Sequence, residues 1–63
     1  MSKSKIESLS EELVRVRERK GDLQRIIDQM NEFGLDTDEA ERKWDALDDE
    51  EDELLEKLES LTE

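Results

Sequence analysis

The sequence lacks the residue types on which several common protein chemistries depend. Its 63 residues include no cysteine, no histidine and no proline, and only two glycines. Without cysteine or histidine there is no disulfide, no thiol nucleophile, no imidazole acid–base group and no usual ligand set for structural zinc. We therefore expect neither a bound metal nor a cofactor.

Long apolar runs are also missing. No stretch approaches the roughly 18 consecutive apolar residues that a membrane-spanning helix requires. The polar start, Met1–Lys5, is not followed by the apolar segment of a secretory signal. We expect a soluble, cytoplasmic protein that does not bind membranes.

Charge is abundant but unevenly distributed. Charged residues make up 49% of the chain, and the net charge is −11. Basic and acidic residues balance in residues 1–34, so the whole net charge lies in residues 35–63, where Asp48–Glu53 is the densest acidic run. So polar a composition is close to that of disordered chains, and only a regular placement of the apolar residues would favour folding.

The apolar residues do recur regularly, at alternating steps of three and four. Such steps place them at the a and d positions of a heptad, which is typical of amphipathic helices that pack along a seam. Two runs show the pattern, Ile6–Met30 and Ala40–Leu61, and each is interrupted by a charged residue, Lys20 or Glu51. The seam positions are Ile6, Leu9, Leu13, Val16, Lys20, Leu23, Ile27 and Met30, then Ala40, Trp44, Leu47, Glu51, Leu54, Leu58 and Leu61.

Helix boundaries can be read from capping residues. Ser4 followed by Glu7 is a capping box, and so is Asp36 followed by Glu39. Gly34 suits the left-handed residue that follows a helix C-terminus. The chain is therefore predicted to be a single domain, 1–63, with a helix over about 5–33, a loop over 34–36 and a helix over about 37–61.

So short a loop should fold the second helix back along the first. The predicted fold class is all-α, a two-helix antiparallel coiled-coil hairpin; a single continuous rod is the alternative, which Gly34 disfavours. Folding brings the basic segment Arg15–Lys20 level with the acidic run, and Lys20 to within about a turn of Glu51. Arg19 and Glu50, both at g, would flank that pair. A charge in an apolar seam costs stability but fixes alignment, so we predict that Lys20 and Glu51 set the register.

Some apolar residues lie beside the seam rather than in it. Ile26 and Phe33 fall at g and Leu55 at e, so the apolar stripe is wider than a single partner helix covers. We predict that these three residues bind a partner, and that two hairpins dimerise into a four-helix bundle. Alternatively, Phe33 and Trp44 pack with neighbouring seam residues to close the tip of the hairpin.

Sequence motifs for catalysis and metal binding are absent. There is no nucleophile elbow, phosphate-binding loop or dinucleotide fingerprint. A calcium loop starting at Asp36 would need an acid, a glycine and a glutamate where Ala40, Glu41 and Leu47 stand. We expect no enzyme, and the net charge of −11 argues against direct nucleic-acid binding by the basic segment.

These features favour a non-enzymatic acidic helical hairpin that binds itself or another protein, as an adaptor, a small chaperone or an inhibitor. The alternative is a nucleic-acid mimic whose acidic second helix blocks the basic groove of a DNA- or RNA-binding protein. In size and charge such a mimic resembles small phage-type inhibitors. The acidic candidates for binding a basic partner surface are Asp48, Asp49, Asp52, Glu53 and Glu56.

Overall fold

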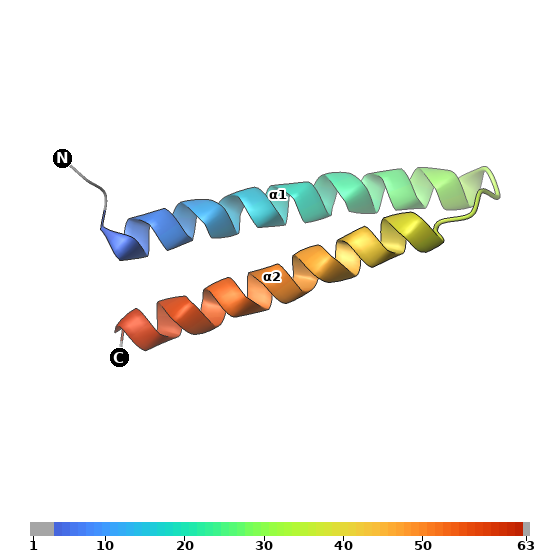
Figure 1. Cartoon of the computed structure of the whole chain (residues 1–63). Helices are drawn as coiled ribbons and strands as arrows, with labels where there is room; N and C mark the ends of the chain where they lie inside the picture. The colour runs from blue at the N-terminus through green and yellow to red at the C-terminus, as the bar shows by residue number, and fades with distance from the viewer. Residues whose placement is uncertain (1–3, 63) are drawn as a thin grey trace.

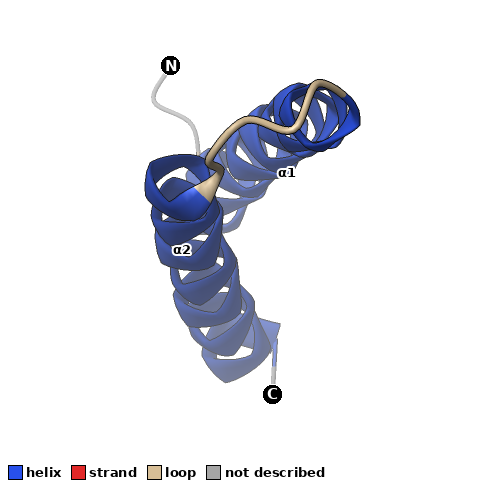
Figure 2. Cartoon of the chain, turned by 90° about the vertical axis from the view of Figure 1, so that its right-hand side faces the viewer, coloured by secondary structure: helices blue, strands red, loops and turns tan. Residues whose placement is uncertain are grey.

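The computed structural model describes residues 4–62 and contains two α-helices, α1 (Lys5–Glu32) and α2 (Asp38–Thr62). The helices pack antiparallel, so the start of α1 and the end of α2 share one end of the molecule and the loop forms the other (Figure 1). The predicted all-helical pair is thus confirmed. Viewed from the loop end, the helices cross at an angle instead of running strictly side by side (Figure 2).

Helix α1 begins at the predicted cap. The side chain of Ser4 accepts a hydrogen bond from the backbone N–H of Glu7 at 3.1 Å, while Ser4 itself has extended backbone angles. One of the N–H groups that the first turn of a helix leaves unpaired is satisfied in this way.

Helix α1 ends in a glycine-dependent turn. Gly34 has φ 71°, a left-handed conformation that costs glycine nothing. The N–H of Leu35 donates to the carbonyl of Met30 at 2.8 Å, and the N–H of Gly34 donates to the carbonyl of Asn31 at 3.1 Å. This pair of bonds is the Schellman arrangement, which satisfies the last carbonyls of the helix and turns the chain back.

Helix α2 begins one residue later than predicted. Thr37, not Asp36, occupies the boundary, because its carbonyl accepts the first helical hydrogen bond, from the N–H of Glu41 at 2.8 Å. Asp36 instead accepts from the N–H of Asp38 at 3.0 Å, two residues on, as in an Asx turn. The predicted Asp36–Glu39 capping box is therefore wrong, and the loop extends through Thr37, which is buried.

The core is short. Leu13, Val16 and Leu54 form a cluster in which each side chain is exposed by 7% or less, and Ile27 is buried separately, nearer the loop. The seam is looser at the end away from the loop, where Leu61 is 40% exposed. The partly buried residues around the cluster are Leu9, Leu47, Leu55 and Leu58.

The seam has two sides, because in an antiparallel pair e positions of both helices share one side and g positions the other. We call the e side the closed side, since Leu55 packs there against the buried cluster; near the loop this side has a pocket lined by Gln24, Glu41 and Trp44. We call the g side the open side. The closed side includes Arg17, Asp48 and Leu55; the open side includes Arg19, Ile26, Lys43 and Glu50.

Candidate functional site

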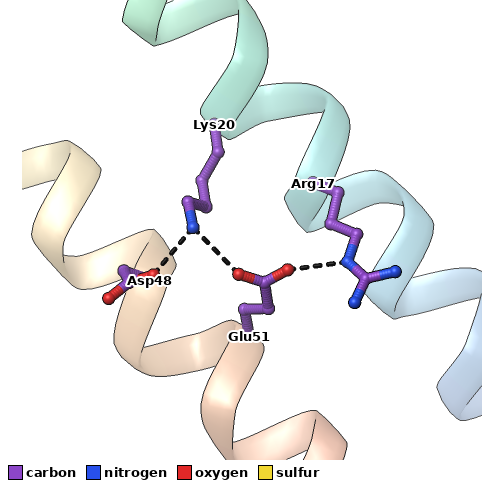
Figure 3. Close-up of polar contacts among 4 residues, drawn as sticks. All are labelled: Arg17, Lys20, Asp48 and Glu51. Atoms are coloured by element: carbon purple, nitrogen blue, oxygen red, sulfur yellow. Dashed lines mark hydrogen bonds and ion pairs between the residues drawn. The ribbon is translucent and has the colours of Figure 1, made fainter.

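A polar cluster interrupts the apolar seam between the buried cluster and Ile27. The ammonium of Lys20 in α1 donates to Asp48 Oδ1 at 2.7 Å and to Glu51 Oε1 at 2.9 Å, both in α2 (Figure 3). Arg17 Nε donates to the other carboxylate oxygen of Glu51 at 2.6 Å. The Lys20 and Glu51 side chains are 17% and 15% exposed, so this ion pair is largely shielded from water.

Lys20 also lies over an aromatic ring. Its Nζ is 4.5 Å from the centroid of Trp44, a cation–π contact. Trp44, Asp48 and Glu51 follow one another at steps of four and three, so they lie along one face of α2 and converge on a single lysine. Sliding α2 by a turn would break these contacts together, which supports a role for Lys20 and Glu51 in setting the register; that role stays a prediction.

The contacts shift the pKa of both central groups in opposite directions. Hydrogen bonds to Asp48 first, and then to Glu51, raise the pKa of Lys20 above its ordinary 10.5. Hydrogen bonds from Lys20 first, and then from Arg17, lower the pKa of Glu51 below its ordinary 4.5. Partial burial opposes both shifts but is the weaker effect. Both groups are therefore charged at neutral pH.

Two members of this cluster were missed by sequence reasoning. Asp48 was grouped with the outward-facing acids, and Arg17 was given no role beyond its place in the basic segment Arg15–Lys20. A spacing signal existed, because Asp48 precedes Glu51 by three residues and Arg17 precedes Lys20 by three, which puts each pair on one helix face. The expected flanking pair, Arg19 with Glu50, forms no ion pair in the part of the chain that the structure describes.

The open side carries an apolar groove between the helices near the loop. Its floor is formed by seam residues Leu23 and Leu47, and Ile26 borders it with 50% of its surface exposed. Charged residues rim the groove on both helices. The lining comprises Leu23, Ile26, Ala46 and Leu47, with Arg19, Asp22, Lys43 and Glu50 at the rim.

A second groove lies on the same side at the far end of the hairpin. Leu9 and Leu61 form its apolar part, and Lys5, Lys57 and Glu53 are among its polar residues. These residues hold d, g and c positions, as do those of the first groove, so both grooves face the same direction from the seam. The open side is thus incompletely covered at both ends.

The structure separates the three apolar candidates. Leu55 is partly buried against the core cluster on the closed side. Ile26 borders the groove on the open side, and Phe33 is 77% exposed at the tip. Phe33 therefore does not close the tip, whereas Trp44 is half-buried beside Ile27.

The acidic candidates divide as well. Asp48 is engaged by Lys20, but Asp49, Asp52, Glu53 and Glu56 are exposed and form no ion pair within residues 4–62. No group of three or more carboxylates among these residues converges to hold a metal ion. Neither described helix is long and apolar enough to cross a membrane.

Comparison with known proteins gives no relative: no protein-family model, curated protein or solved structure matches the chain.

Proposed function

We propose that this chain is a non-enzymatic protein-interaction module of the cytoplasm, an acidic helical hairpin that acts as an adaptor, a small chaperone or an inhibitor. The observation that carries the proposal is the apolar groove on the open side, bordered by the half-exposed Ile26. A partner that covers this groove would remove the apolar surface from water and gain about 25 cal/mol per Å² buried.

The size of the core supports the same proposal. Only four apolar side chains are buried within residues 4–62, namely Leu13, Val16, Ile27 and Leu54. A chain of this length gains little net stability from its own core, and natural proteins of such size often add an oligomeric interface. Two hairpins that join through their open sides would form a four-helix bundle, with Leu23 and Leu47 in its interior.

The experiment compares two apolar residues of matched exposure. Ile26 is 50% exposed at the groove, and Val14 is 53% exposed away from it, among Ser10, Glu11 and Arg15. We expect I26D to lose association with partners while V14D keeps it, with both variants as helical as the natural chain by circular dichroism.

Association is measured by light scattering of the purified chain and by rebinding of purified proteins first captured from an extract. If I26D and V14D bind equally well to every partner found, the groove is not the interaction surface and the proposal fails.

A second candidate, nucleic-acid mimicry, is favoured by a different observation. Asp49, Asp52 and Glu56 lie on the outer surface of α2, exposed and without ion pairs within residues 4–62. Carboxylates at helical spacing could occupy a basic groove in place of phosphates, with long-range attraction speeding the encounter. Salt separates the candidates, because screening weakens a charge-driven complex much more than an apolar one.

A further inference from the structure

We infer that the partner of the open side is a second copy of this chain, packed so that α1 of each copy lies against α2 of the other and both loops share one end. The inference rests on the proposed function, because it names the occupant of the same surface. It is carried by the order of charges along the open side, not by the apolar groove alone.

The charges on the open side of α1 follow a simple order. Beyond Lys5 at the start of the helix, they run acid, base, base, acid toward the loop. The residues occupy g and c positions, and two of them, Arg19 and Asp22, line the first groove. They are Glu12, Arg15, Arg19 and Asp22.

The open side of α2 carries the opposite order over the same length. Read in the same direction, from the far end toward the loop, it runs base, acid, acid, base, followed by a last acid, Glu39, beside the loop; the four are Lys57, Glu53, Glu50 and Lys43. Because Lys20 bonds to Glu51, the neighbouring Arg19 lies nearly level with Glu50. Three of the four charges on α1 thus have an opposite charge on α2 at a similar height, and the fourth, Asp22, shares the rim of the first groove with Lys43.

These charged residues do not pair with one another within one hairpin. None of the eight forms an ion pair within residues 4–62, although Arg19 and Glu50 rim the same groove. With Lys5 and Glu39 included, five of the charges at g and c positions are basic and five are acidic, so these positions sum to zero while the whole chain carries −11. A neutral surface of alternating sign offers little to a strongly basic partner, but it is complementary to itself, as the isologous interface of a two-fold dimer must be.

The charge order also selects the orientation of the copies. With the loops at the same end, α1 of one copy faces α2 of the other at equal height, so Arg19 meets Glu50 and Glu12 meets Lys57 of the second copy. With the loops at opposite ends and the hairpins fully overlapped, Arg19 meets Arg19 and Glu50 meets Glu53. Like charges in contact cost stability, so the first arrangement is favoured.

The test exchanges charges between copies, using R19E and E50R. Alone, each variant places like charges at two symmetric contacts, so we expect its dimer to be about tenfold weaker. Mixed together, the two variants restore both contacts, and the mixed dimer should exceed half of all dimers by native mass spectrometry. A contact within one hairpin would be equally disturbed in every species, so a preference for the mixed dimer reports contacts between copies.

Matched controls use charges on the outer surface of the same helices. R25E and D49R reverse charges at f positions, away from the seam, and mixing them should give dimers in statistical proportion. Circular dichroism checks that every variant retains its helices.

A distance between spin labels placed beside the loop tests the orientation of the copies without changing any charge on the open side. Spin labels at E32C, beside the loop, should lie roughly 20–30 Å apart when the loops share an end, given neighbouring helix axes about 8–10 Å apart. The hairpin is 48 Å long, so loops at opposite ends would give a distance near that length. This measurement decides the arrangement even if R19E or E50R fails to fold.

Three results would overturn the inference: a helical monomer at high micromolar concentration, a statistical mixture of R19E with E50R, or a loop-to-loop distance near the hairpin length. A monomer that still binds another protein through Ile26 would reject the second copy and keep the proposed function. A chain with no partner of either kind would reject both.

Discussion

The two sides of the helix seam differ in what completes them. On the closed side, Leu55 packs against the core cluster and Arg17 bonds to Glu51 across the seam. On the open side, Ile26 remains half-exposed, and Arg19 and Glu50 rim a groove without bonding to each other within the described chain. Each side has an apolar residue and an Arg–Glu combination. Only on the closed side is the apolar residue packed, and only there are the arginine and the glutamate bonded, within the hairpin itself.

This difference separates two properties of the protein. The closed side and the core hold the two helices together, so changes there should alter the stability of the hairpin at any concentration. The open side contributes little within one hairpin, so changes there should act on association. If variants of the closed side changed only association, or variants of the open side changed the stability of the hairpin, this distinction between the two sides would be wrong.

The largest expected effect comes from the core. Leu54 is 5% exposed, and replacing it with alanine should cost about 2–5 kcal/mol of unfolding free energy, because it removes buried methyl groups and leaves a cavity. L55A should cost about 1 kcal/mol, since Leu55 is only partly buried, and V14A less than about 0.5 kcal/mol. Urea unfolding followed by circular dichroism at low micromolar concentration measures all three.

Because L54A should leave little folded protein, the series is best built on a stabilised background. Gly21 lies inside α1, and a Cβ added there would meet nothing within 4 Å. G21A should therefore raise the unfolding free energy by about 1 kcal/mol without touching either side of the seam. If L55A costs as little as V14A in this background, the closed side is not closed by Leu55.

The polar cluster should give the next largest effect. K20M or E51Q alone breaks the shielded ion pair and leaves the remaining charge with one partner instead of two, so each should lower the urea midpoint, by less than L54A does. The combined variant, K20L with E51L, should be as stable as the natural chain or more so, while its helix alignment loosens. A double-mutant cycle with no coupling would show that the pair does not act as a unit.

The helices and their caps could be predicted because their causes are local. Alternating steps of three and four define one helix face wherever the chain ends up, and Ser4 and Gly34 act on backbone groups within a few residues. The meeting of Lys20 with Glu51 was also predictable, since a short loop leaves few ways to align two seams. The predicted start of α2 was one residue too early, because an aspartate such as Asp36 can accept a hydrogen bond from the backbone N–H two residues on as well as cap a helix.

The difference between the sides could not be predicted from heptad positions. Ile26 at g and Leu55 at e flank the seam in equivalent ways, and which is covered depends on how each helix is rotated and at what angle the two cross (Figure 2). That rotation is set by all the packed residues together, including Trp44 beside Lys20. Spacing puts Asp48 on the same helix face as Glu51, but whether its carboxylate reaches Lys20 depends on the same rotation.

The pH dependence of stability should report the polar cluster. The pKa of Glu51 is lowered in the folded state, so its stabilisation is complete above the ordinary value of 4.5 and is lost as pH falls through the folded value. The pKa of Lys20 is raised, so its stabilisation is present below 10.5 and is lost as pH rises beyond the folded value.

Thermal melts of the natural chain and E51Q between about pH 3 and 7 test this dependence. The advantage of the natural chain should be full near neutrality and shrink below 4.5. Subtracting the melting temperature of E51Q from that of the natural chain removes the effect of the other carboxylates, whose mutual repulsion weakens in both proteins as they protonate. D49N is the control, because Asp49 lies on the outer surface of α2 and has no ion pair within residues 4–62, and a similar shrinking advantage over D49N would contradict a specific role for Glu51.

The smallest effect on stability is expected on the outer surface of α2, which belongs to neither side of the seam. Reversing Asp49 and Asp52 to lysine removes like-charge neighbours at i,i+4, so each relieved pair should add about 0.2–0.5 kcal/mol. Self-association through the open side should persist, because neither residue lines either groove. Binding to a basic partner should vanish, and in the natural chain it should weaken steeply between about 50 and 500 mM salt, as the screening length falls from over 10 Å to under 5 Å. If partner binding instead survives the reversal and hardly changes with salt, mimicry is wrong, and the open side is the surface at which this hairpin works.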